Sequence, residues 1–105
     1  MIARLWRGQA VPAKAGDYQR HFEQAVCPAL AALAGHRGAW LLRREAEGRV
    51  EFLAVTLWDS VEAIRAFAGE DVEAAHVEPE GRAALVAFDD FARHYEVVHE
   101  FPSPA

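Results

Sequence analysis

Three side chains of this sequence combine a reactive group with a position that could serve chemistry. Arg4 lies in an alternating apolar segment, where a buried guanidinium would need either an anion in a pocket or a carboxylate partner such as Glu51 or Glu96. His76 could act as a base or a ligand, although its acidic neighbours also fit a solvated surface histidine. Tyr95 could donate its hydroxyl to a ligand oxygen, or it could simply pack with that hydroxyl satisfied elsewhere.

Aromatic residues recur at strand spacing and could line a site for a flat ligand. Trp6 and Trp58 could hold a planar substrate between them, with Phe52 on the same strand as Trp58 and Phe67 on a nearby helix. Aromatic stripes at this spacing also form ordinary cores, because each ring buries about 150–250 Å². The sequence therefore leaves two interpretations open, a ligand-binding wall and a packed core.

Other kinds of site lack their motifs. His94 and His99 are five residues apart and so point to opposite faces of a strand, while His21 and His36 belong to different elements. We therefore expect no metal site. No glycine-rich loop ends in Gly-Lys-Ser/Thr, and no serine lies in a nucleophile-elbow motif. Cys27, the single cysteine, sits in an apolar helical pattern and is expected to be a small buried residue.

Length and composition limit the classes to which the chain can belong. Its 105 residues suffice for a single domain, residues 1–105, with one core. The formal net charge is −5 and the arginines are scattered, so the basic patch of a nucleic-acid binder is missing. No apolar run has the shape of a signal peptide or approaches transmembrane length. Because one cysteine allows no disulfide framework, we expect a cytoplasmic protein. From the charge and the apolar runs we expect neither nucleic-acid nor membrane partners.

The N-terminal third predicts a strand followed by a kinked helix. Side chains alternate over residues 2–9 in the manner of a strand. An amphipathic stripe over residues 14–33 predicts a helix, and Pro28 lies inside it. Because proline lacks a backbone donor and clashes with the preceding turn, we expect a kink near Ala25 or two abutting helices.

The middle of the chain predicts a hairpin and a second helix. Residues 39–45 and 50–58 read as paired strands, and the second of them is apolar on both faces, which predicts a central strand. Asp59 is the expected N-cap of the helix that follows, with Glu62 completing a capping box. Gly69 is expected to end that helix.

The C-terminal part predicts an acidic loop with a short helical turn at residues 70–82, an ambiguous apolar segment at 83–91 and a last strand at 94–101. The resulting order, β-α-β-β-α-β, is that of a ferredoxin-like α+β domain with two helices on one face of a four-stranded antiparallel sheet. The other face is expected to carry one register of aromatic residues, an assignment that inverts if the helices cover that register instead: Trp6, Phe52, Trp58, Tyr95 and Phe101. Such a face exceeds what monomers usually expose, which predicts a homodimer with two facing sheets.

Three segments of the sequence resemble one family over nearly the whole chain. They are Ile-Ala-Arg-Leu-Trp at residues 2–6, Val-Glu-Phe-Leu-Ala-Val-Thr-Leu-Trp-Asp-Ser at 50–60 with the helix after it, and His-Tyr-Glu-Val-Val at 94–98. These segments resemble the antibiotic biosynthesis monooxygenase superfamily. The resemblance implies a dimeric α+β barrel, and its members include quinol and anthrone monooxygenases that work without metal or flavin, haem-degrading enzymes, and proteins with no established activity.

The resemblance implies different chemistry for its different branches. Haem-degrading members use an asparagine on the first strand, a tryptophan on the second helix and an iron-ligating histidine after it; here these positions hold Trp6, Phe67 and His76. With one match in three, haem degradation is not expected. In cofactor-free members polar groups stabilise a deprotonated aromatic hydroxyl that reacts with oxygen. By that analogy Arg4 would stabilise the phenolate, and His76 or Tyr95 would take the proton.

Two functions therefore remain as hypotheses. The first is a cofactor-independent monooxygenase acting on a small aromatic hydroxyl compound of the quinol or anthrone type. The second is a non-catalytic dimeric barrel that binds a small hydrophobic ligand or serves a structural or interaction role. A polar group inside the barrel would favour the enzyme, whereas a cavity packed shut by Trp6, Phe52 and Trp58 would favour the second hypothesis.

Overall fold

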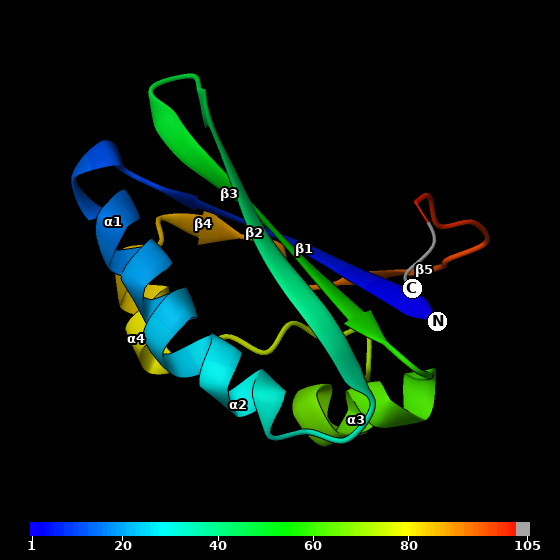
Figure 1. The fold of residues 1–105 in the computed structure, drawn as a ribbon. Coiled ribbons are helices and arrows are strands. Elements are labelled where there is room, and N and C mark those ends of the chain that lie inside the picture. The colour runs from blue at the N-terminus through cyan, green and yellow to red at the C-terminus, as the bar shows by residue number, and fades with distance from the viewer. Residues whose placement is uncertain (103–105) are drawn as a thin grey trace.

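Three long strands form the centre of an antiparallel sheet in the computed structural model, which describes residues 1–102. The sheet order is β2-β3-β1-β4, and β5 pairs with the first half of β1. All helices lie on one side of the sheet (Figure 1), which confirms the predicted ferredoxin-like α+β architecture. The elements in chain order are β1 (Ile2–Ala10), α1 (Pro12–His21), the π-helical turn η1 (Phe22–Val26), α2 (Cys27–Ala31), β2 (His36–Ala46), β3 (Arg49–Trp58), α3 (Val61–Ala68), α4 (Pro79–Ala84), β4 (Ala87–Phe88) and β5 (Arg93–Glu96).

The predicted kink in the first long helix is a π-helical turn. The backbone N–H of Cys27 bonds to the carbonyl of Phe22, five residues earlier. Pro28 follows at the start of α2, where its missing N–H would otherwise interrupt an α-helical ladder. The wider turn accommodates that missing donor, and such turns are common sites of helix kinks.

Two local predictions in the second half of the chain were wrong. Ser60, not Asp59, caps α3: its hydroxyl accepts a bond from the Ala63 N–H at 3.2 Å, while Asp59 instead accepts from Arg37 Nε at 2.5 Å. The expected last strand at residues 94–101 ends at Glu96, and the ambiguous segment before it contributes the two-residue strand β4. Gly69 does end α3, with a φ of +88° that suits glycine.

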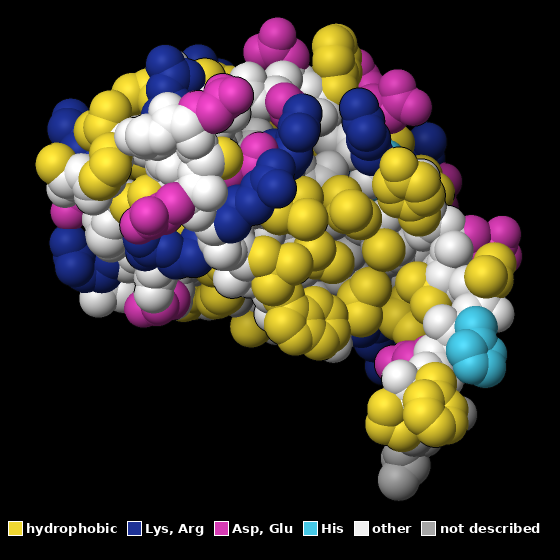
Figure 2. All heavy atoms as spheres, turned by 90° about the horizontal axis from the view of Figure 1, so that it is seen from above, with side chains coloured by type: hydrophobic (Ala, Val, Ile, Leu, Met, Phe, Trp, Pro, Cys, Tyr) yellow, Lys and Arg dark blue, Asp and Glu magenta, His cyan; other side chains and the backbone are white. Residues whose placement is uncertain are grey.

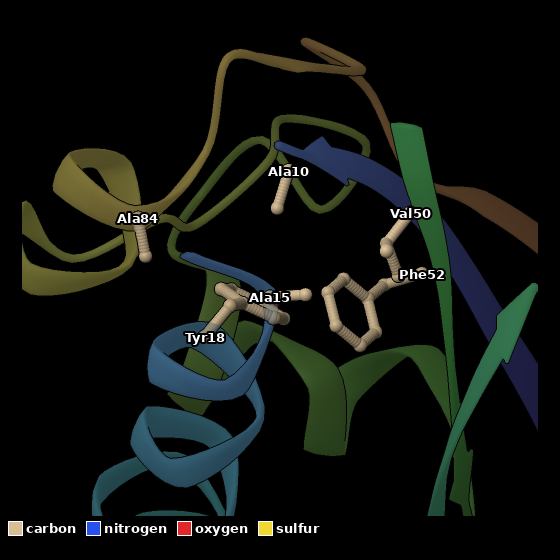
Figure 3. Packing of buried hydrophobic residues seen from close by; sticks show 6 residues of the cluster. All are labelled: Ala10, Ala15, Tyr18, Val50, Phe52 and Ala84. Carbon is tan, nitrogen blue, oxygen red and sulfur yellow. The ribbon is translucent and has the colours of Figure 1, made fainter. Parts of the chain in front are cut away.

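The side-chain register of β1 and β3 is inverted relative to the predicted one, whereas Tyr95 of β5 lies on the uncovered face as predicted. Trp6, Phe52 and Trp58 point toward the helices, and Phe52 and Trp58 are fully buried there. Figure 3 shows Phe52 and Val50 of β3 meeting Tyr18 and Ala15 of α1 in one core cluster. Because β3 is apolar on both faces, its alternation could not decide which face the helices cover.

The other face of the sheet is uncovered and apolar. In the paired register, Leu5 of β1 lies opposite Val55 of β3, which lies opposite Trp40 of β2. Trp40 is 51% exposed, and Leu42 and Tyr95 of the same face are exposed to a similar degree. Figure 2, which views this side, shows a continuous apolar patch bordered by basic side chains. Among the described helices, none is long and apolar enough to cross a membrane.

Candidate active site

A cavity of about 60 Å³ lies between the helix-covered face of the sheet and the helices. Its walls come from β1, β3, the α1–η1–α2 helix, α3 and the segment 76–81. Polar side chains at this site are Arg4, His21, Thr56, His76 and Glu78; the other lining residues are Trp6, Tyr18, Phe22, Val26, Leu30, Ala54, Phe67, Val77 and Gly81. A free volume of this size holds only a few water molecules. It is smaller than the roughly 300–1,000 Å³ that is usual for ligand sites.

Arg4 is the most deeply buried charged residue of the described chain, with 4% of its surface exposed. Its Nη1 donates to the carbonyl of Val72 and contacts His94 Nε2 at 2.9 Å, and its Nη2 donates to the carbonyl of Ala74 at 3.0 Å. The guanidinium also lies 5.9 Å from the ring centre of Phe67. These bonds tie β1 to the segment after α3, and they hold the guanidinium at the cavity wall.

No carboxylate neutralises this guanidinium among residues 1–102. Of the two partners considered from the sequence, Glu51 bonds to Arg44 at 2.8 Å, and Glu96 forms no bond to Arg4. Burial lowers the pKa of Arg4, but a guanidinium starts so high that it stays charged. Three of its five N–H donors have partners among the described residues, and the other two have none there.

His94 completes the surroundings of Arg4 on β5. Burial and the Arg4 charge lower the pKa of His94, and Glu73 partly opposes them. The imidazole is therefore neutral near pH 7, and its Nε2 can accept a bond from the guanidinium. A neutral acceptor does not offset the buried charge, so no side chain bonded to the guanidinium neutralises it among the described residues.

His76 lies at the mouth of the cavity. Its ring meets the edge of Phe67 with centroids 5.1 Å apart, and Phe67 in turn packs on Trp58 at 5.9 Å. The side chain is exposed on one side, as its acidic neighbourhood suggested, yet it also lines the cavity. Arg4, Phe67 and His76 therefore meet at one site.

The predicted aromatic residues divide between the cavity and the core. Trp6 lines the cavity and is held by Tyr18 and Phe88, with its Nε1 donating to the carbonyl of Asp89 at 2.8 Å. Phe52 and Trp58 belong to the core instead. Trp58 still influences the site, because its Nε1 donates at 2.8 Å to the hydroxyl of Thr56 in the cavity wall.

Tyr95 is not brought to this cavity. It pairs with Ala3 on the uncovered face of the sheet, whereas its neighbour His94 pairs with Arg4 on the covered face. The sheet therefore separates the Tyr95 hydroxyl from Arg4 and His76 of the same chain.

Most of the other cavity residues were not predicted from the sequence, among them Tyr18, His21 and Thr56. Tyr18 and His21 are three residues apart on α1, and this spacing places both side chains on one face of the helix. That spacing is the one sequence signal that could have predicted them as neighbours in a site. Burial raises the pKa of Tyr18, so its hydroxyl stays protonated. The sequence argues only against His21 and His36 as shared metal ligands, because they belong to different elements.

A second hollow of about 300 Å³ lies on the other side of η1, lined by Gln19, Phe22, Glu23, Cys27, Leu41, Arg43 and Phe52. Cys27 is partly exposed there, although we expected it to be buried. Partial burial is the main cause that raises the pKa of its thiol, and the negative charge of Glu23 raises it further. A thiol held protonated in this way is a poor nucleophile.

Within residues 1–102, no group of three or more His, Cys, Asp or Glu side chains is placed to hold a metal ion.

No protein-family model matches the chain, and no curated protein matches it. Solved structures do match. One is the haem degrader MhuD from Mycobacterium tuberculosis with two haems bound in its active site, which is 25% identical, with 95% of this chain and 98% of that one covered and a TM-score of 0.63. Another is an MhuD mutant with two manganese protoporphyrin IX bound per active site, which is 24% identical, with coverage of 98% and 100% and a TM-score of 0.63. The chain has the ferredoxin-like antibiotic biosynthesis monooxygenase fold.

Proposed function

We propose that this protein is a cofactor-independent monooxygenase acting on a small aromatic hydroxyl compound of the quinol or anthrone type. The observation that carries the proposal is the buried guanidinium of Arg4, which has no carboxylate partner and two unused donors beside an aromatic-lined cavity. A buried unpaired cation is unfavourable unless an anion joins it. A phenolate oxygen is an anion that fits both the charge and the aromatic wall.

The chemistry needs only a deprotonated substrate and oxygen. Loss of the hydroxyl proton makes the ring electron-rich, and Arg4 stabilises the negative oxygen through preorganised N–H donors. The ring carbon then reacts with dioxygen. Because the substrate itself supplies both electrons, one oxygen atom enters the product as a new carbonyl and the other leaves as water. His76, which is near Phe67 at the cavity mouth, is one candidate for the group that takes the proton.

Substrate entry requires the cavity to widen. A free volume of about 60 Å³ is smaller than the apolar cavity of about 150 Å³ that accepts a benzene ring in another protein. The π-helical turn η1 supplies Phe22 and Val26 to one wall, and such turns are frequent at functional sites. Displacement of this turn would open the space beside Arg4.

The structural neighbours hold haem or manganese protoporphyrin IX, but haem is not the substrate proposed for this chain. Trp6 and Phe67 fill parts of the cavity wall, and Trp6 is fixed by its bond to Asp89. A porphyrin would have to displace both rings. The limited space also favours the alternative function, a non-catalytic barrel that binds a small hydrophobic ligand, and the experiment below separates the two.

A homodimer is part of the proposal. The uncovered sheet face carries a continuous apolar patch that includes the half-exposed side chains of Trp40, Leu42 and Tyr95. A second copy stacked on it would bury that patch and close the barrel. Specific interfaces of this kind bury about 1,600 Å² or more.

The test compares Arg4→Met with wild type for oxygen uptake on a panel of quinols and anthrones. Removing one preorganised donor from a developing anion costs about 100- to 1,000-fold in rate. Arg7→Met is the matched control, because Arg7 lies on the same strand but is exposed and paired with Asp89 at 3.2 Å. Circular dichroism checks that both variants fold.

The expected result is a large loss in Arg4→Met and little change in Arg7→Met. Equal rates in the wild type and a folded Arg4→Met variant would remove Arg4 from the site. If wild type takes up no oxygen on any of these substrates but binds them, the non-catalytic alternative holds instead.

A further inference from the structure

His21 is the one cavity histidine that lies inside the protein. Its side chain is only 7% exposed, and its Nδ1 is buried without a hydrogen-bond partner in the described residues. Leaving a polar atom buried without a hydrogen bond is unfavourable. A buried nitrogen of this kind needs a partner, and the carboxylate of Glu80 on α4 is a candidate, with Oε2 at 3.6 Å from Nδ1.

The two ring nitrogens of His21 have different surroundings. Nδ1 is sealed between α1 and α4 on the side of Glu80, while Nε2 lies against Gly81, which itself lines the cavity. A Cβ at position 81 would be 3.2 Å from Nε2, so the absence of a side chain there makes room for the imidazole.

We propose that His21 is the proton acceptor of the site and that Glu80 is the residue that positions it. Glu80 would hold the proton on Nδ1, which leaves the lone pair of Nε2 directed at a hydroxyl bound near Arg4. This assignment rests on the proposed function. The substrate hydroxyl breaks its O–H bond, the proton moves to Nε2, and the phenolate remains with Arg4.

The separation of 3.6 Å is longer than a hydrogen bond, but it closes easily. The Glu80 side chain is 84% exposed and free to move, whereas the imidazole is fixed by Tyr18 at 6.2 Å between ring centres and by Gly81. Catalytic hydrogen bonds are often long before the ligand binds and shorten in the complex. His76, in contrast, lies at the exposed mouth, where water competes for its nitrogens.

The first test does not depend on any substrate. Two-dimensional ¹H–¹⁵N NMR of histidine-labelled protein near pH 8 reports which ring nitrogen of His21 carries the proton. The pairing with Glu80 requires the Nδ1–H tautomer in wild type and a mixture of tautomers in Glu80→Gln. A wild-type His21 held as the Nε2–H tautomer would overturn the proposal.

The second test measures oxygen uptake on the substrates used for Arg4. A positioned base typically contributes about 100- to 10,000-fold, so His21→Gln should lose at least about 100-fold. Glu80→Gln should lose on the order of tenfold, the lower end of what an orienting partner contributes. In His21→Ala, added imidazole should restore part of the rate, which a purely structural role would not allow.

Gly81→Ala tests the same geometry without altering the histidine. The added methyl group presses on Nε2, so the rate should fall, while Gly16→Ala in α1 is the control because a Cβ there meets nothing within 4 Å. A His21→Gln variant as active as wild type would overturn this proposal alone. A wild type inactive on every substrate would instead overturn the proposed function, and the base role of His21 with it.

Discussion

The two faces of the sheet differ in the chemistry of their side chains. The helix-covered side holds most of the polar groups: the buried guanidinium of Arg4, the histidines His21, His76 and His94, and a small cavity. The uncovered face has the larger exposed apolar surface. A polar group is retained inside only when it is satisfied or used, and an apolar patch is retained outside only when something covers it.

The proposed function places a small molecule against the covered face and a second copy of the chain against the uncovered one. On the covered face, Arg4 is bonded to the segment after α3, so a ligand that binds it could also order that segment. On the uncovered face, neighbouring strands supply matched rows of side chains such as Leu5, Val55 and Trp40. Flat rows of this kind complement a second sheet rather than a small ligand.

The largest expected effect comes from placing a charge in the middle of the uncovered face. Val55 lies between Leu5 and Trp40 on neighbouring strands. In Val55→Asp, a dimer formed through this face would therefore bury an unpaired carboxylate. We expect wild type to be a dimer and the variant to be a monomer near 11.6 kDa, with a lower denaturation midpoint. Light scattering at low micromolar concentration measures the mass of each.

Val61→Asp is the control for this substitution, because Val61 is an exposed residue at the start of α3 and lies outside the sheet. It should leave the mass of the dimer unchanged. A wild type that is a folded, monodisperse monomer at the same concentration would contradict the assignment of the uncovered face.

Much of the fold could be predicted from the sequence, because its signals are local. The strand alternation, the doubly apolar β3 and Pro28 in the helical stripe fix the element order and the kink. The choice of face could not be predicted, since both registers of β3 are apolar and only the helices' own packing decides between them. The cap of α3 was missed because Asp59 and Ser60 are both good caps and are adjacent.

The site was predictable only in part. Arg4 stood out because a charge in an alternating apolar strand is unusual, and the structure places it in the cavity. Its partners could not be predicted: the carbonyls of Val72 and Ala74 are almost seventy positions away and carry no side-chain signal. His21 and His76 approach the cavity from separate elements, a tertiary juxtaposition that no spacing rule reveals.

The second prediction concerns haemin binding at the cavity on the covered face. Because Trp6 and Phe67 occupy the cavity wall, wild type should bind haemin weakly, without a sharp ligated Soret band and without ring opening under reductant. Trp6→Ala removes an indole from the wall and should bind haemin more tightly, once circular dichroism has shown that it folds. Tight binding and conversion to an open-chain product by wild type would mean that the neighbours' substrate is also that of this chain.

A smaller effect is expected on folding stability at acidic pH, through His94, which contacts Arg4. Burial and the Arg4 charge lower the pKa of His94 in the folded state, whereas the unfolded value is about 6.5. The unfolded chain therefore takes up the proton first as the pH falls. The stability contributed by neutral His94 is present above about pH 6.5 and is lost as the pH falls through the folded pKa. His36, whose pKa burial also lowers, acts in the same direction.

Urea denaturation between pH 5 and pH 8 tests this expectation. His94→Gln keeps an acceptor for Arg4 but cannot titrate, so its stability should fall less steeply on acidification than that of wild type. His99→Gln, which removes an exposed histidine beyond β5, is the control and should follow wild type. Parallel curves for wild type and His94→Gln would show that the Arg4–His94 contact does not hold the imidazole neutral.

The smallest expected effect is the sharpest test of the separation between the faces. Tyr95 is 53% exposed and pairs with Ala3 on the uncovered face, so its hydroxyl has no path to the cavity of its own chain. Tyr95→Phe keeps the ring that the proposed dimer would bury and removes only a hydroxyl that has no hydrogen-bond partner among the described residues. Stability should therefore change by no more than about 0.5 kcal/mol. Oxygen uptake should stay within about twofold of wild type, far from the loss of about 100-fold or more expected for Arg4→Met. A tenfold drop in a dimeric Tyr95→Phe variant would mean that the hydroxyl reaches reacting atoms across the sheet interface, and the two faces would then form one site.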